Sequence, residues 1–322
     1  MSKHLIFISL CLLLVGCQLG GSDAANQPET RHLANNLIVQ QADAPAMIQD
    51  GELVAVDPET VELVLPSTDF SYLVHLGNRY TQENGDIIVT NRQEGTSEPL
   101  FPTPDREERR IWGIADTWLL VESIPNGTAV DGVGPILAIN LDGNGALPVT
   151  DDSLSGNPIV SPFNHIIYST ADGAFAWHPD DTREIMPFDS FLSGSFSPDG
   201  IYLAVDTGEA IDIFNMARLQ HIASVTPSAA NSDTPPPPIA WHPNAEWLAY
   251  TISEEVDRSV YVANVETLDV KVLPNVVDPQ FSPDGEWLAV YDLPRSSIKL
   301  VNLETNETLP FGIDGRPILW LE

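Results

Sequence analysis

A short segment rich in acidic and amide side chains has residue types that could bind calcium. Asn140 to Gly145 reads Asn-Leu-Asp-Gly-Asn-Gly, which partly matches the start of an EF-hand loop whose twelfth position would be Asp151. An EF-hand needs a bidentate Glu at that position and a helix on each side, whereas residues 136–139 and 146–149 have the composition of short strands. The segment is therefore predicted to be the turn of a β-hairpin, with calcium binding as the alternative.

Two of the seven histidines, His178 and His242, occur in the same phrase, Trp-His-Pro. Histidine pairs often contribute to metal sites. However, His242 replaces the serine of a repeated phrase described below, whereas His178 falls in the outer hairpin of its own repeat unit. The two side chains are therefore expected at different places in the fold, and no metal ligand is predicted.

Signatures of catalysis are absent from the sequence. It contains no Gly-x-Ser-x-Gly elbow, no His-Glu-x-x-His zinc motif and no glycine loop for phosphate. Ser282 to Trp287 differs in spacing from the aspartate box of sialidase-type propellers. We therefore predict no catalytic, cofactor-binding or metal-binding residue.

The N-terminal segment carries one chemically committed residue, Cys17. One Lys precedes an apolar run from Leu5 to Leu14, which is too short to span a membrane and ends in Leu-Val-Gly-Cys. This pattern resembles a bacterial lipoprotein signal, which implies that residues 1–16 are removed and that Cys17 receives the lipid. The alternative is an ordinary secretory signal in which Cys17 is incidental. The only other cysteine, Cys11, lies in the removed segment, so the mature chain is expected to have no disulfide.

Residues 17–45 are predicted to be a lipid anchor and disordered tether, because they are polar and poor in aromatic residues. A flexible chain of this length places the following domain on the order of 30 Å from the bilayer. The expected location is therefore the cell envelope, with the protein exported and anchored to a membrane, the outer membrane being one option.

Charge limits the partners that the chain can have. The sequence has 46 Asp and Glu against 14 Lys and Arg, a formal net charge of −32, so nucleic acid and anionic lipid surfaces should be repelled. The one basic cluster, Arg106, Arg109 and Arg110, is interleaved with glutamates in a predicted loop. It is interpreted as a solvated patch, with a docking role as the alternative.

A repeated phrase predicts the architecture that positions these residues. Phe-Ser-Pro-Asp-Gly occurs at 196–200 and 281–285, and a looser copy, Trp-His-Pro-Asn-Ala, occurs at 241–245. The copies start about 45 and 40 residues apart, a period typical of propeller blades. Pro, Asp and Gly suit a tight turn, so Asp199 and Asp284 are expected to have a turn role instead of a metal or catalytic one.

A second recurrent signal, a short strand ending near a proline, predicts the number of blades. It occurs seven times with a mean period of about 41 residues between Pro66 and Pro310. The first unit contains only a hairpin, residues 53–56 and 61–64, whereas the chain ends in an unpaired strand, residues 317–322. The fold predicted for residues 46–322 is thus an all-β propeller, most simply seven four-stranded blades closed by the C-terminal strand, with six or eight as alternatives. The seven tryptophans are expected to pack mostly between blades.

The phrase Phe-Ser-Pro-Asp-Gly-x-x-Leu-Ala, followed by a strand rich in Ile and Val, is similar to the TolB-type, WD-like propeller repeat. The resemblance is strong over residues 194–227, 238–274 and 278–311 and weak before residue 150. It implies a non-catalytic scaffold that binds an envelope protein or another ligand. The alternative is a glycan-binding protein, or a propeller hydrolase or lyase with a carboxylate-lined central channel.

Overall fold

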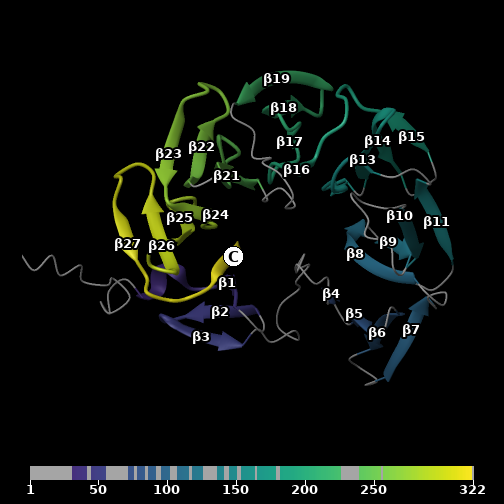
Figure 1. Cartoon of the computed structure of the whole chain (residues 1–322), viewed down its shortest axis with the longest axis horizontal. Coiled ribbons are helices and arrows are strands. Elements are labelled where there is room, and N and C mark those ends of the chain that lie inside the picture. The colour runs from purple at the N-terminus through teal and green to yellow at the C-terminus, as the bar shows by residue number, and fades with distance from the viewer. Residues whose placement is uncertain are drawn as a thin grey trace, which may run out of the picture.

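Seven four-stranded antiparallel sheets form the protein, and they surround a common centre as the blades of a β-propeller (Figure 1). The computed structural model describes residues 31–41, 45–55, 72–75, 78–83, 86–91, 96–101, 107–115, 118–125, 136–140, 145–150, 154–163, 165–178, 182–225, 239–254 and 257–320. Within these ranges the only regular helix is a 3-10 turn at Arg31–Ala34, and no helix has the length and apolarity needed to cross a membrane.

The blades are numbered along the chain, and the strands of each are given from the centre of the ring outward. Blade 1 contains β28 (Arg316–Trp320), β1 (Leu37–Gln40), β2 (Pro45–Gln49) and β3 (Glu52–Ala55), and blade 2 contains β4 (Tyr72–His75), β5 (Asn78–Glu83), β6 (Asp86–Asn91) and β7 (Thr96–Phe101). Blade 3 contains β8 (Glu107–Ala115), β9 (Trp118–Pro125), β10 (Ile136–Asn140) and β11 (Ala146–Thr150), and blade 4 contains β12 (Ile159–Val160), β13 (Ile166–Thr170), β14 (Gly173–Trp177) and β15 (Arg183–Ile185). Blade 5 contains β16 (Ser193–Phe196), β17 (Tyr202–Asp206), β18 (Ile211–Asn215) and β19 (Gln220–Val225). Blade 6 contains β20 (Ala240–Trp241), β21 (Trp247–Glu254), β22 (Asp257–Asn264) and β23 (Val270–Pro274), and blade 7 contains β24 (Val276–Phe281), β25 (Trp287–Asp292), β26 (Ser297–Asn302) and β27 (Thr308–Pro310).

The first blade is built from both ends of the described chain. β28 pairs antiparallel with β1, with Leu37 opposite Trp320 and Gln40 opposite Arg316. The chain's C-terminus accordingly lies at the centre of the ring in Figure 1. The predicted closure by the C-terminal strand is confirmed, and it supplies the innermost strand that the first repeat unit lacks.

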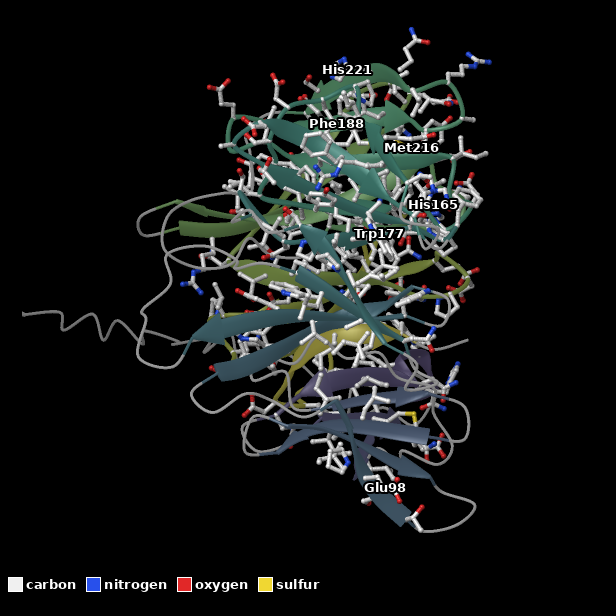
Figure 2. The ribbon with its side chains drawn as sticks, turned by 90° about the vertical axis from the view of Figure 1, so that its right-hand side faces the viewer. Glu98, His165, Trp177, Phe188, Met216 and His221 are labelled. Atoms are coloured by element: carbon white, nitrogen blue, oxygen red, sulfur yellow. The ribbon has the colours of Figure 1, made fainter. Side chains whose placement is uncertain are left out.

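Apolar side chains from neighbouring sheets form the core. One cluster joins Ile211 and Ile213 of blade 5 to Trp241 and Tyr250 of blade 6. Another joins blade 7 to blade 1, with Trp287 and Trp320 among its members. In Figure 2, Trp177 and Phe188 lie among the side chains packed between strands, whereas Glu98 and His221 lie near opposite ends of the view. Large aromatic side chains fill the space between neighbouring sheets. The buried tryptophans of this kind are Trp177, Trp241, Trp287 and Trp320.

The Pro-Asp-Gly turns have the local geometry expected from their sequence. In blade 5, Ser197 Oγ donates to Asp199 Oδ1 at 2.6 Å, and Ile201 N donates to the same oxygen at 3.0 Å. In blade 7, Ser282 Oγ and Glu286 N donate to Asp284 Oδ1 at 2.5 and 3.0 Å. The following glycine takes a positive φ in both turns, 71° and 75°. Each Asp therefore closes a turn, as predicted.

Three sequence-based predictions need correction or fall outside the described chain. The propeller begins before residue 46, because Leu37–Gln40 already forms the second strand of blade 1. The last described strand of that blade is Glu52–Ala55, which pairs with Pro45–Gln49, and residues 61–64, predicted to form a hairpin with residues 53–56, lie outside the described chain. Arg109 and Arg110 belong to β8 and not to a loop, since they pair with Ser123 and Glu122 of β9.

Candidate functional site

The innermost strands give the ring two chemically different faces. Each blade is an antiparallel meander, so its innermost strand starts at one face of the ring and ends at the other. We call the side where the innermost strands end the C-terminal face and the opposite side the N-terminal face. The repeated Pro-Asp-Gly turns follow the ends of β16 and β24, and they therefore lie at the C-terminal face.

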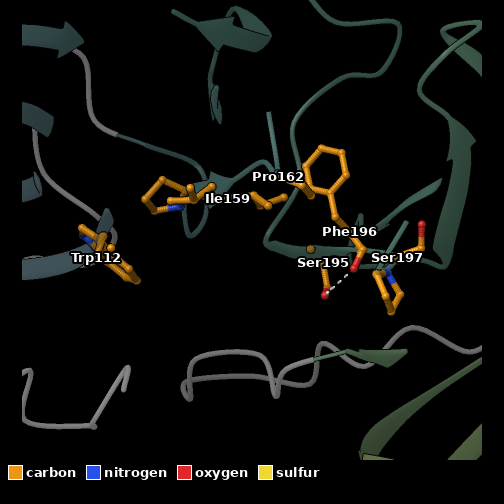
Figure 3. Close-up of a pocket in the computed structure, with 11 residues that line it drawn as sticks. Trp112, Ile159, Pro162, Ser195, Phe196 and Ser197 are labelled. Carbon is orange, nitrogen blue, oxygen red and sulfur yellow. Dashed lines mark hydrogen bonds between the residues drawn. The ribbon is translucent and has the colours of Figure 1, made fainter. Parts of the chain in front are cut away.

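Two adjoining cavities open along the innermost strands toward the C-terminal face. The first has a volume of about 450 Å³ and is walled by blades 3, 4 and 5 (Figure 3). The second has a volume of about 370 Å³ and is walled by blades 5, 6, 7 and 1. Ser195, Phe196 and Pro198 of blade 5 line both cavities, so blade 5 forms the wall between them. Volumes of this size are typical of small-ligand and side-chain pockets.

Prolines at equivalent positions in four consecutive blades form the rim of these cavities. Pro162, Pro198, Pro243 and Pro283 each follow the Ser or His that ends the inner-strand phrase, and all four are exposed. Proline fixes its own φ, and the serines beside three of them are hydrogen-bonded within their turns. The rim is thus rigid and apolar before any ligand binds.

Aromatic side chains line the cavities beneath the proline rim. Trp241, Phe281 and Trp320 are largely buried in the second cavity, while Phe196 contributes to both cavities. Trp241 Nε1 donates to Ser195 O at 3.0 Å, and Trp320 Nε1 donates to Asn35 O at 2.9 Å. In Figure 3, Trp112 lies apart from Ile159, Pro162 and Phe196 on the other side of the first cavity. Since both indole groups already have acceptors, these two rings present apolar surface only.

None of the described residues that line the two cavities carries a charged side chain; the polar ones are Ser195, Ser197, Gln280 and Ser282. Trp112 Nε1 donates to Glu122 Oε2 at 3.2 Å, but Glu122 is fully buried and lines neither cavity. A carboxylate-lined channel is therefore not found among the described lining residues. The second cavity therefore presents mostly apolar surface, whereas serine and backbone groups contribute a large part of the surface of the first.

Outside the proline rim lies a set of carboxylates that we call the acidic collar, namely Asp199, Glu246, Asp284 and Glu286. All four are exposed and belong to the turns that start with Pro198, Pro243 and Pro283. No ion pair joins any of them to another described residue. The C-terminal face thus combines an apolar centre with an uncompensated negative edge.

The N-terminal face has a different organisation, because its polar groups bind one another across blades. Asp278 N, at the bulge in β24, donates to Thr251 Oγ1 of blade 6 at 3.0 Å, and Asp278 Oδ2 lies 3.6 Å from Arg316 Nη1 of blade 1. Burial raises the pKa of Asp278 above its ordinary value, and the charges of Arg316 and Arg258 act in the opposite direction. In the core between blades 5 and 6, burial also raises the pKa of Tyr250, with further contributions from Tyr261 and Asp206. Asp278 and Arg316 line neither cavity.

The residues considered for metal binding do not converge. His178 lies against His165, with 3.9 Å between ring centroids, whereas His242 packs on Phe281, and its Nε2 lies 3.0 Å from Gly285 O. Within the described ranges no three His, Cys, Asp or Glu side chains are placed to hold a metal ion. Ile139 pairs with Ala146 in the β10–β11 hairpin, which confirms strands on both sides of the Asn140 segment. Cys17 lies outside the described residues.

Comparisons with known proteins show the fold. No protein-family model and no curated protein matches the sequence. Among solved structures, an oligogalacturonate lyase from Vibrio parahaemolyticus superposes with a TM-score of 0.53 at 11% identity, covering 72% of this chain and 76% of that chain. An oligogalacturonate lyase in complex with manganese gives 0.52 at 14% identity, covering 70% and 73%, and the Dos1 propeller gives 0.50 at 9% identity, covering 75% and 68%. At these identities the similarity establishes a β-propeller and leaves the activity open.

The cavity lining could not be identified from the sequence, because the site is assembled from short segments of six blades. A signal was present: one Ser-Pro or His-Pro pair occurs in each of blades 4 to 7, namely Ser161-Pro162, Ser197-Pro198, His242-Pro243 and Ser282-Pro283. Their turn chemistry accounts for the Ser and Asp residues, but it does not require an exposed proline in every copy. The four prolines that recur in this way are exposed and border the two cavities.

Proposed function

We propose that this protein is a lipid-anchored, exported β-propeller that binds a protein partner in the cell envelope through its C-terminal face. The observation that carries the proposal is the pair of adjoining cavities lined by aromatic, prolyl and aliphatic groups and bordered by carboxylates that form no ion pair with another described residue. A concave pocket with a few polar groups among aromatic and apolar side chains is the usual starting point for a binding-site hypothesis. Anchoring rests on the lipoprotein-like junction before Cys17.

Site-specific photo-crosslinking in native cells tests the binding face. A photoreactive residue replaces Ile201, which is 43% exposed beside the first cavity, and, as the matched control, Glu209, which is exposed in the β17–β18 turn at the N-terminal face. We expect one protein to be captured in near-stoichiometric yield from position 201 and not from position 209. Equal capture from both positions, or none from position 201, would contradict the proposal.

The anchor is tested separately by metabolic labelling with a fatty acid analogue and by detergent phase partitioning. The intact chain should incorporate the label and enter the detergent phase, and a Cys17→Ala variant should do neither. If the Cys17→Ala variant still partitions with detergent, the membrane association does not come from lipid on this residue.

The alternative function, an envelope glycan binder or a propeller hydrolase or lyase, requires carboxylates near Arg or His in the channel. Asp278 and Arg316 are a described pair of this kind, and they lie outside both cavities. Turnover of an acidic oligosaccharide by the purified protein, lost in Asp278→Asn, would favour the alternative.

A further inference from the structure

We propose that the occupant of the C-terminal face is a basic, extended polypeptide segment that inserts bulky apolar side chains into the two cavities. This inference rests on the proposed function and specifies the chemistry of the partner. It follows from three features of the site: the aromatic and prolyl side chains of the lining, the internal hydrogen bonds of most polar side chains there, and the acidic collar.

The size and lining of the cavities fit apolar side chains. Each cavity can hold a large side chain, and the two share the wall formed by Phe196 and Pro198, so residues a few positions apart in one segment can enter both. The apolar surface continues outside the first cavity, where Phe163 is 59% exposed. Its ring lies over Gly200, because a Cβ placed on Gly200 would be only 2.9 Å from Phe163 Cζ. In protein–protein interfaces, a few bulky side chains that become buried in pockets supply most of the binding free energy.

The polar groups of the lining are mostly engaged within the protein, which disfavours a glycan. Ser197 Oγ and Ser282 Oγ donate to the Asp of their own turns, and the indole groups of Trp241 and Trp320 donate to backbone carbonyls. A sugar, with a hydroxyl on most carbons, needs many new partners when it is desolvated. A polypeptide segment needs few, because its side chains can supply the apolar contact.

The acidic collar determines the charge of the segment. Its four carboxylates surround three of the rim prolines, and no described base neutralises them. The chain as a whole carries a formal charge of −32, so an acidic segment would be repelled at a distance and a basic one attracted. The rigid turns reduce the ordering cost on the protein's side of the interface.

The test uses three fluorescent synthetic heptapeptides and the purified full-length protein, at low and high salt. The first probe has a central Trp between two prolines with two lysines at each end; the second has Ala in place of Trp, and the third has glutamates in place of the lysines. We expect the first probe to bind, the other two to bind at least about tenfold more weakly, and added salt to weaken the first.

Two matched pairs of variants locate the binding. Pro198→Arg places a charged side chain in the wall shared by both cavities and should weaken the first probe at least about tenfold. Pro187→Arg changes an equally exposed proline outside the cavities and should have no effect. The double variant Glu246→Lys, Glu286→Lys should weaken binding of the first probe about fivefold and reduce its salt dependence. The double variant Asp172→Lys, Glu209→Lys makes an equal change of charge at the N-terminal face and should leave this binding unchanged.

The inference is overturned if the first probe does not bind, if the acidic probe binds as well, or if either control weakens binding as much as its partner variant. Thermal unfolding of every variant shows that each is folded. Crosslinking from position 201 without binding of the basic probe would reject the inference and leave the proposed function standing. Binding of the probe without a partner in cells would reject the proposed function instead.

Discussion

The two faces of the propeller are made from the same strands and use their side chains in opposite ways. At the N-terminal face, the backbone N–H of Asp278 donates to Thr251 of blade 6 and its carboxylate is paired with Arg316 of blade 1, so this residue links three neighbouring blades. At the C-terminal face, the aromatic and prolyl groups border two cavities, and the collar carboxylates form no ion pair with another described residue. The comparison indicates that one face contributes to the integrity of the ring and that the other is available to a partner.

The largest expected effect concerns Trp320, where the ring closure and the C-terminal face meet. Trp320→Ala removes a nearly buried ring that packs between blades 7 and 1 and donates to Asn35 O, and it also removes part of the wall of the second cavity. We expect a loss of about 3–5 kcal/mol in the free energy of unfolding, measured by urea denaturation. Ile185→Ala, at a residue 80% exposed on β15, is the control and should change it by less than about 0.5 kcal/mol. Similar losses from both variants would show that Trp320 has no special role in closure.

The closure strand also shows what sequence could and could not predict. The phrase at Phe196 and Phe281 contains its own turn signal, so the strands of blades 5 to 7 could be located from it. Blade 1 could not be drawn correctly, because its β1 strand, Leu37–Gln40, lies in a polar stretch, and its innermost strand lies at the other end of the chain. Local patterns specify hairpins, whereas pairing between distant segments depends on the closed ring.

A second prediction compares the turns within the C-terminal face. A Cβ at Gly285 would lie 2.3 Å from His242 Nε2, and the residue has a φ of 75°, so Gly285→Ala introduces both a clash and backbone strain. We expect a loss of about 2 kcal/mol, measured by thermal and urea unfolding. Gly208→Ala is the control for strain alone, because its φ of 87° is similar and the atom nearest to the new Cβ, Leu192 Cδ1, lies at an ordinary contact distance of 3.4 Å. Gly285→Ala should cost less in a His242→Ala background, and an unchanged cost would exclude the clash as its cause.

The third prediction uses the copy of the turn that departs from the pattern. In blade 6, Ala245 occupies the glycine position and has a φ of 61°, a left-handed conformation that alanine adopts at a cost. Ala245→Gly should therefore increase the free energy of unfolding by about 0.5–1 kcal/mol. Ala217→Gly, in a turn where the φ is not positive, should decrease it. Destabilisation by Ala245→Gly would mean that the buried methyl group contributes more than the strain costs.

The candidate site was harder to predict than the turns that carry it. Asp199 and Asp284 follow a rule of local chemistry, and their role was predicted correctly. The cavities depend on how Trp112, Phe196 and Trp320 are brought together from three blades, and no spacing in the sequence records that arrangement. The placement of Arg109 in a strand, where a loop was expected, has a similar cause, because the pairing of β8 with β9 overrides a locally charged pattern.

The smallest expected effect is a change in pH dependence at the N-terminal face, produced by Asp278→Asn. Burial raises the pKa of Asp278 above 3.8, so the folded state binds this proton more tightly than the unfolded state does. The resulting stabilisation is fully present below the unfolded pKa and is lost as the pH rises through the folded pKa. Asn keeps the shape and tolerates the φ of 55° but does not titrate. The free energy of unfolding of the wild type, minus that of the variant, should therefore fall as the pH rises from about 4 and then level off, measured by urea unfolding up to about pH 8. Asp314→Asn, at an exposed carboxylate just before β28, serves as the control. A difference that rises with pH would mean that the attraction of Arg316 exceeds the cost of burial, and Asp278 would then be a stabilising ion-pair partner of the closure strand at neutral pH.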